Sequence, residues 1–114
     1  MRRVLEGKYY YVGDIYETGT AAHVTTDQNQ PSDAGRWQKG NYFATKEEAE
    51  AIVAKIKRIR EGSLKVFAVW HVTNPNFAEP SVTKYRMVGY DSQEEAIRIK
   101  NAIGKLFKPN TPKE

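Results

Sequence analysis

Apolar residues recur at the spacing of an amphipathic helix in two stretches of the chain, residues 46–60 and residues 93–107. Steps of three and four residues place such positions along one side of a helix. The sequence therefore predicts two helices, each with one buried side. The predicted buried positions are Ala49, Ile52, Val53, Ile56 and Ile59 in the first helix, and Ala96, Ile99, Ile103 and Leu106 in the second.

Each predicted helix has a capping signal at its start. Thr45 is followed three residues later by Glu48, and Ser92 is followed in the same way by Glu95. In a capping box the hydroxyl accepts a hydrogen bond from the backbone N–H three residues on, and the glutamate reaches back to the N–H of the cap. We expect Thr45 and Ser92 to begin the helices and Gly62 to end the first one.

The segments between the predicted helices have the aromatic and β-branched content of strands. Residues 64–72 are apolar on both faces apart from Lys65 and His71, which predicts a central strand. Residues 21–26 either continue the strand before them or form another. Residues 27–35 are polar and have no periodicity, which predicts an exposed loop. The other expected strands are residues 8–12, 15–17, 36–43 and 82–88.

The pattern of strands followed by a helix occurs twice, in residues of about 8–62 and about 63–107, with a mobile tail at 108–114. A chain of 114 residues has room for a single domain, residues 1–114. We therefore expect a two-layer α+β fold, in which both helices pack on one face of an antiparallel sheet and the other face is open.

The residue content of the chain excludes several kinds of functional site. The chain has no cysteine, which excludes disulfides and thiolate metal sites. Its two histidines, His23 and His71, lie in different repeats without a carboxylate at a ligand spacing, so we expect no metal site and no cofactor. No catalytic motif is present, which favours a protein that is not an enzyme. No apolar run approaches the length of a membrane span, so we expect a cytoplasmic protein.

The net charge of +4 favours a polyanionic partner, and the strands and loops mix bases with aromatic residues. Our leading hypothesis is a nucleic-acid interface formed by Arg36, Trp37, Lys39, Lys84 and Arg86. One alternative is a protein-binding surface formed by Tyr9, Tyr11, Asp27 and Asp33, in which an acidic loop lies beside a tyrosine-rich strand. Another alternative is a homodimer whose partner copy covers the open face of the sheet.

Two resemblances add to this interpretation. Residues 8 to about 60 resemble a recurring segment of small bacteriophage and prophage proteins of unassigned function. The residues that carry this resemblance are Tyr9-Tyr10-Tyr11, Asp33, Arg36, Gly40-Asn41, Phe43, Thr45 and Glu47-Glu48-Ala49. Residues 43–50 also resemble the sheet-to-helix joint of the AP2-like arm-binding domain of phage integrases, and residues 89–96 resemble that joint in AP2-type domains generally.

The AP2-type families place a three-stranded sheet in the major groove of DNA. Their strands are rich in Arg and Lys, whereas residues 9–16 here contain neither. The phage resemblance implies a mobile-element origin, for which we expect a bacterial host, and it implies no activity for that segment. For the protein-binding alternative, one example is a phage inhibitor of a host defence or nucleic-acid enzyme. The leading expectation remains a small binding domain that contacts DNA or RNA.

Overall fold

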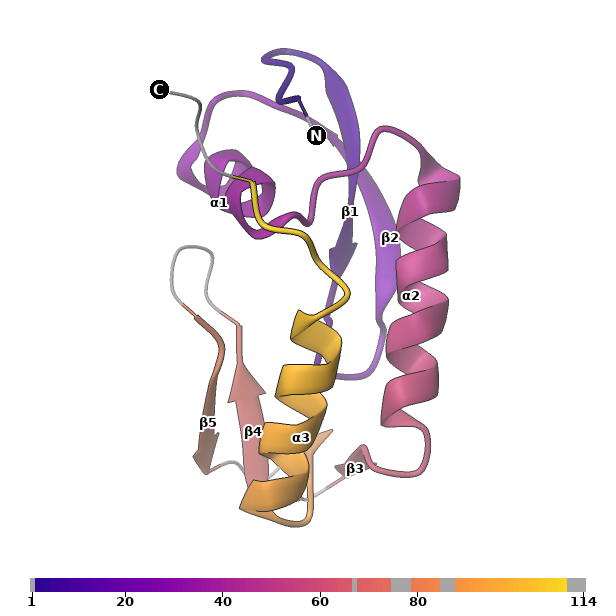
Figure 1. Ribbon diagram of the computed structural model, residues 1–114, viewed down its shortest axis with the longest axis vertical. Helices are drawn as coiled ribbons and strands as arrows, with labels where there is room; N and C mark the ends of the chain where they lie inside the picture. The colour runs from indigo at the N-terminus through magenta and orange to yellow at the C-terminus, as the bar shows by residue number, and fades with distance from the viewer. Residues whose placement is uncertain (1, 67, 75–78, 85–87, 111–114) are drawn as a thin grey trace.

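The computed structural model describes residues 2–66, 68–74, 79–84 and 88–110, and it has the predicted α+β fold (Figure 1). Its elements divide between the two repeats. The first repeat contains β1 (Lys8–Gly13), β2 (Ala21–Thr26), α1 (Pro31–Lys39) and α2 (Lys46–Arg60). The second repeat contains β3 (Lys65–Val66), β4 (Trp70–Thr73), β5 (Ser81–Lys84), β6 (Val88–Gly89) and α3 (Gln93–Gly104).

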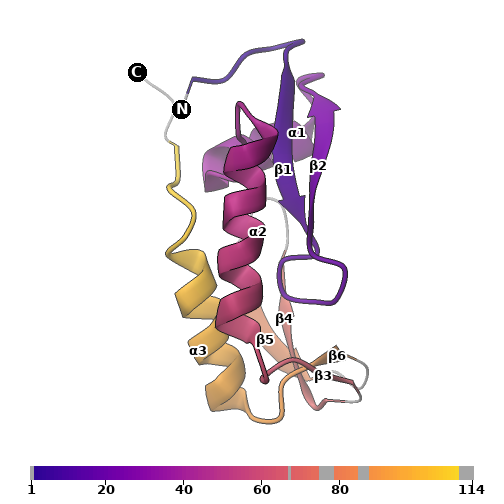
Figure 2. The same cartoon turned by 90° about the vertical axis from the view of Figure 1, so that its right-hand side faces the viewer.

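Each long helix packs on the hairpin of its own repeat. β1 and β2 form an antiparallel pair that is covered by α2, and β4 and β5 form a second antiparallel pair that is covered by α3. Figure 2 shows α2 and α3 side by side in one layer with the hairpins in the other. This arrangement confirms the prediction that both helices lie on the same face of the strands.

The helix starts are confirmed. The Thr45 hydroxyl accepts a hydrogen bond from the backbone N–H of Glu48 (3.2 Å), and the Ser92 hydroxyl accepts one from the N–H of Glu95 (3.1 Å). The glutamates differ from the predicted box: the Glu48 carboxylate accepts from the Thr45 hydroxyl itself, and the Glu95 carboxylate accepts from Ser63. Both helices therefore begin where the local sequence places them, because capping needs only neighbouring residues.

The predicted apolar positions of both helices face the core. Five of them are fully buried, and the others are partly buried and pack against the same cluster. α3 ends at Gly104 rather than at residue 107, and Leu106 packs on the core from the segment that follows. The fully buried positions are Ala49, Ile56, Ala96, Ile99 and Ile103.

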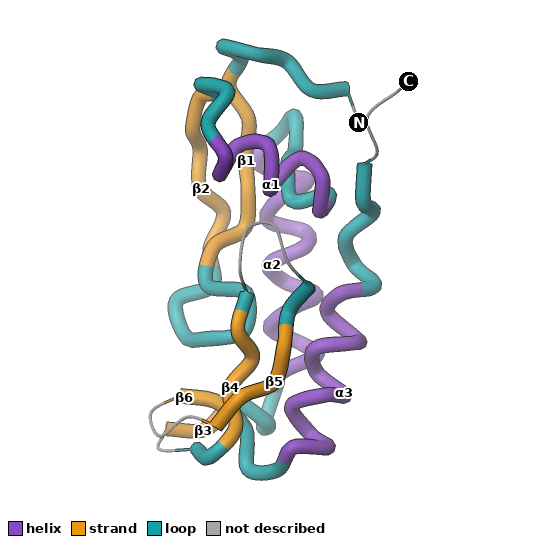
Figure 3. The backbone as a smooth tube through the Cα atoms, turned by 90° about the vertical axis from the view of Figure 1, so that its left-hand side faces the viewer, coloured by secondary structure: helices purple, strands orange, loops and turns teal. Residues whose placement is uncertain are grey.

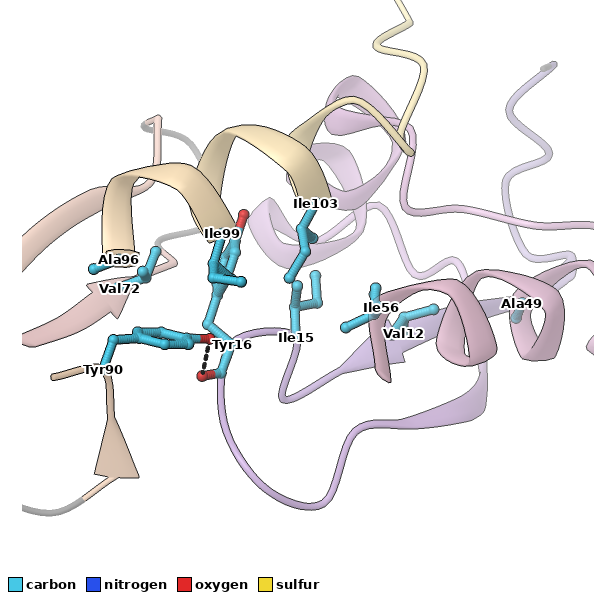
Figure 4. Packing of buried hydrophobic residues seen from close by; sticks show 10 residues of the cluster. All are labelled: Val12, Ile15, Tyr16, Ala49, Ile56, Val72, Tyr90, Ala96, Ile99 and Ile103. Carbon is cyan, nitrogen blue, oxygen red and sulfur yellow. Dashed lines mark hydrogen bonds between the residues drawn. The ribbon is translucent and has the colours of Figure 1, made fainter. Parts of the chain in front are cut away.

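The two halves meet at the connection between β1 and β2. Ile15 and Tyr16 lie in this connection and are buried between the two helices (Figure 4). The backbone carbonyl of Tyr16 accepts a hydrogen bond from the Tyr90 hydroxyl (3.3 Å), and the carbonyl of Ile15 accepts one from the buried Arg60 guanidinium (2.8 Å). Residues 15–17 were expected to form a strand, and this expectation is wrong because the segment instead joins the two repeats.

The expected antiparallel sheet is divided. The described residues form three two-stranded ladders, β1–β2, β3–β6 and β4–β5, and a single bridge from Trp70 to Tyr90 connects β4 to the end of β6. Figure 3 shows the β1–β2 and β4–β5 hairpins end to end. The predicted central strand 64–72 is interrupted between β3 and β4, where the Val69 side chain is exposed. A run that is apolar on both faces predicts burial but does not reveal this break.

The predicted loop at residues 27–35 is wrong in its second half, because α1 begins at Pro31. Gln30 and Asp33 form a capping box at its start, and proline suits the first helical position because it lacks an N–H that would remain unbonded. The expected return of residues 36–43 to the sheet is also wrong, since α1 continues to Lys39. Of that segment, only Phe43 pairs with β1, through a bridge to Tyr10.

Candidate functional site

Asp27 is fully buried at the end of β2 and holds the start of the chain in place. Its carboxylate accepts two hydrogen bonds from the Arg3 guanidinium (2.7 and 3.0 Å), one from the Tyr42 hydroxyl (3.0 Å) and one from the backbone N–H of Asn29 (2.9 Å). The bonds from Arg3 hold the pKa of Asp27 below its usual value, and those from Asn29 and Tyr42 act in the same direction. Asp27 is therefore a structural ion-pair centre.

Asp33 is the second buried carboxylate of this region. It accepts a 2.5 Å hydrogen bond from the Tyr9 hydroxyl and two 3.1 Å bonds from the backbone N–H groups of Gln28 and Gln30. The Tyr9 hydroxyl in turn accepts a bond from Arg36 (3.0 Å). Burial and the bond to Asp33 raise the pKa of Tyr9. Asp33 thus ties α1 to β1 and orders the turn before the helix.

These two hydrogen-bond networks show that the predicted protein-binding surface is wrong for most of its residues. Tyr9, Asp27 and Asp33 are buried, so their side chains are not available to a partner, and the expectation of an exposed acidic loop is wrong for both aspartates. Tyr11 is half-buried, with the Arg36 guanidinium 3.8 Å from the centre of its ring. Sequence reasoning missed these roles because the side-chain partners of each carboxylate, Arg3 and Tyr42 for Asp27 and Tyr9 for Asp33, are distant along the chain.

Three of the five residues predicted to bind nucleic acid lie together on α1. Arg36 and Lys39 are in its last turn, where cations are favoured by the helix dipole, and Trp37 lies between them. Arg36 is held in one orientation by the Tyr9 hydroxyl and the face of the Tyr11 ring. The prediction that these residues lie on a strand is wrong, but their proximity gives the end of α1 a positive charge.

The segment after α3 packs against this end of α1. The side-chain amide of Asn110 donates to the carbonyl of Trp37 (2.7 Å), and the backbone N–H of Asn110 donates to the carbonyl of Gln38 (2.9 Å). Gly40 follows α1 with a φ of 80°, and its Cα lies against the backbone of Lys108. The expected mobile tail is therefore wrong for residues 108–110, and residues 111–114 lie outside the described residues.

A pocket of about 320 Å³ opens between α1, the connection after β1, and the segment after α3. We call it the α1 pocket. Burial lowers the pKa of the Lys39 ammonium, while the charge of Glu79 opposes that shift. No carboxylate of the described residues lies within ion-pair distance of Lys39. The polar residues that line the α1 pocket are Arg36, Gln38, Lys39, Asn41, Asn74 and Glu79.

Lys84, another of the predicted nucleic-acid residues, is not part of this site. Lys84 is exposed at the end of β5, and Figure 1 shows that end of the strand pointing away from α1. Arg86 lies outside the described residues. The structure therefore places basic residues at the end of α1 and does not bring Lys84 to them.

The histidines do not form a metal site within the described residues. His23 is exposed on β2 beside Tyr11, and His71 lies 3.5 Å from the Glu17 carboxylate at a separate, smaller pocket. No group of three potential ligands was found in the described part of the chain. Among the same residues, no helix is both long and apolar enough to cross a membrane.

Comparison of the chain with family models, with curated proteins and with solved structures finds no match.

Proposed function

We propose that the protein is a non-enzymatic domain that binds nucleic acid, with the phosphate backbone contacting the α1 pocket. The observation that carries this proposal is the lining of the pocket: two cations, Arg36 and Lys39, and the amide side chains of Gln38 and Asn74 line it together with one carboxylate, Glu79. Cations and amides are the side chains that most often contact phosphate oxygens and sugars. The overall charge of +4 supports the same class of partner.

The two cations have different roles in this proposal. Arg36 is fixed by Tyr9, by Tyr11 and by an ion pair with Asp33 (3.8 Å), so binding costs little side-chain entropy. Asp33 balances part of its charge, but the guanidinium has further N–H donors beyond the one that Tyr9 accepts. Lys39 is partly buried and has a lowered pKa, so a phosphate that approaches it meets a cation that is already partly desolvated. Both features favour an anionic ligand at the end of α1.

The resemblance of residues 8–60 to phage and prophage proteins supports a place for this activity in the cytoplasm of a bacterial host. The mobile-element origin stays a prediction. The alternative of an inhibitor that binds a host protein also stays a prediction, but three of the four residues that we named for its surface are buried, which favours the nucleic-acid proposal.

The test is a titration of labelled duplex DNA, single-stranded DNA and RNA by fluorescence anisotropy, at several salt concentrations. Each phosphate contact contributes about 0.9 to the slope of log K against log salt for duplex DNA. Lys39→Ala should therefore weaken binding and lower the slope by about 1. The matched control is Lys65→Ala on β3, an exposed position that removes the same charge away from the α1 pocket.

Two results would overturn the proposal. Absence of binding to all three nucleic acids at low salt would show that the positive charge does not serve this purpose. An equal loss of affinity in Lys39→Ala and Lys65→Ala would show that net charge, rather than the α1 pocket, is responsible for the binding.

A further inference from the structure

The outer edge of β2 has unpaired backbone groups. Tyr10 exchanges backbone hydrogen bonds with Phe43, so its N–H and C=O point away from β2, and its partner across the ladder is Val24. In an antiparallel pair, the backbone N–H and C=O groups of successive residues point alternately toward and away from the neighbouring strand. Those of Ala22, Val24 and Thr26 therefore point away from β1. No described residue bonds to them there.

The outer edge of β1 is covered. Val12 donates its N–H to the side-chain oxygen of Asn41 (2.7 Å) and accepts a bond from the amide nitrogen of the same residue (2.9 Å), and Phe43 pairs with Tyr10. The side chain of Asn41 thus substitutes for a neighbouring strand. The hairpin therefore has one edge closed by its own chain and one edge open.

The open edge lacks the features that prevent edge-to-edge pairing. β2 contains no Lys, Glu, Asp, Arg or Pro in its six residues, and Val24 at its middle is 54% exposed. Natural edge strands usually carry charge, proline or a bulge because unpaired backbone groups recruit other strands. A long, neutral and exposed edge is consistent with a strand that pairs with another chain.

We propose that the outer edge of β2 binds the same edge of a second copy of this chain. A two-fold axis at Val24 would place Ala22 of each copy opposite Thr26 of the other and join both hairpins into one antiparallel sheet. Such an axis keeps the helices of both copies on the same face, with α2 antiparallel to its counterpart. The inference does not depend on the nucleic-acid proposal.

The charges of α2 favour a second copy over an unrelated strand. Residues seven apart lie on the same side of a helix, and the two exposed flanks of α2 each carry an acid followed by a base at that spacing: Glu48 with Lys55, and Glu50 with Lys57. In an antiparallel pair of α2 helices whose two-fold axis passes midway between the acid and the base, the acid of one copy lies toward the base of the other. Either flank is therefore complementary to itself about the two-fold axis.

Sedimentation equilibrium over a range of protein concentrations tests the proposal. We expect a concentration-dependent dimer for the natural chain. Val24→Lys places two like charges opposite each other at the axis and should leave a monomer at concentrations where the natural chain is dimeric. The control is Val69→Lys, at a position that is 51% exposed and lies outside the β1–β2 hairpin.

Amide hydrogen exchange locates the interface. The N–H groups of Ala22, Val24 and Thr26 should gain protection as the protein concentration rises, because only dimerisation gives them acceptors. The N–H groups of His23 and Thr25 point toward β1 and should be protected at every concentration. This pattern separates pairing at the β2 edge from association through another surface.

A charge-reversal series tests the orientation of α2 and does not alter β2. Reversing one charge of the facing pair, for example Glu50→Lys, should weaken the dimer, and adding Lys57→Glu should restore it; Glu48 and Lys55 form the equivalent pair on the other flank. A monomer at the highest concentration would overturn the proposal, and the edge of β2 would then be open to a strand of a different protein. A dimer that survives Val24→Lys, without new protection at β2, would also overturn it.

Discussion

Asp27→Asn is the most direct test of the buried network at the start of the fold. The substitution keeps the shape of the side chain but removes its charge and one acceptor atom. The Tyr42 hydroxyl is buried, so weakening its bond to a charged acceptor costs about 1.5–3 kcal/mol. The Arg3 side chain is 22% exposed, so its ion pair adds about 0–1 kcal/mol after solvent screening.

We therefore expect Asp27→Asn to lower the free energy of unfolding at pH 7 by about 1.5–4 kcal/mol, measured by urea denaturation. The control is Asp91→Asn, at an exposed aspartate in the turn before α3, which should change stability by less than about 0.5 kcal/mol. Equal effects of the two substitutions would refute the structural role of Asp27.

The pH dependence gives a second check on Asp27. Its pKa is lowered in the folded state, so its contribution is fully present above the pKa of about 3.9 that an aspartate has in the unfolded chain. The contribution is lost as the pH falls below that value. The difference in stability between the natural chain and Asp27→Asn should thus be constant from pH 7 to about pH 5 and shrink toward pH 3. A difference that stays unchanged at pH 3 would contradict the argument.

Three further predictions concern packing, backbone conformation and alkaline stability. Ile56→Ala should cost about 2–5 kcal/mol in urea denaturation, because the side chain is fully buried in the core. Gly40→Ala should destabilise more than Gly62→Ala: both glycines have positive φ, which costs about 1–2 kcal/mol for alanine, but only at Gly40 would the new Cβ meet another backbone. Burial raises the pKa of Tyr16 and of Tyr90 to about 12, so both should stay un-ionised at pH 11 in an absorbance titration.

Each of these predictions has a contradicting outcome. A loss below about 1 kcal/mol for Ile56→Ala would place that side chain outside a close-packed core. Equal costs at Gly40 and Gly62 would argue against the contact between the end of α1 and the C-terminal segment. Tyrosine pKa values that are raised in the folded state give stability below pH 10 that is lost as the pH rises, so unchanged stability at pH 12 would contradict their burial.

The two long helices were predictable from the sequence for a local reason. Apolar spacing and a cap need only residues within one or two turns of each other, and the capping contacts of Thr45 and Ser92 form as expected. The α+β class follows from the same local patterns. Each helix also packs on the hairpin of its own repeat, which fits the order of the elements along the chain.

α1 was missed because its signal is weak within the local sequence. Pro31 at the first helical position and Asp33 two residues later are typical of a helix start, but the segment has few apolar residues to mark a buried side. Tertiary contacts supply what is missing: Tyr9 bonds to Asp33, and Arg36 packs on Tyr11. A polar segment can become a helix when distant residues bury its polar groups with partners.

The sequence by itself determined the two amphipathic helices, their caps, the fold class and a group of basic residues that includes Arg36 and Lys39. Only the tertiary structure decided which charged side chains are exposed and which are buried with partners. Asp27 and Asp33 belong to a polar segment, residues 27–35, whose composition is typical of an exposed loop. Their carboxylates nevertheless bind the side chains of Arg3 and Tyr9, which lie 24 residues away in each case. Because hydrogen bonds between distant residues decide whether a charged side chain is buried, no local pattern separates a structural carboxylate from a surface one.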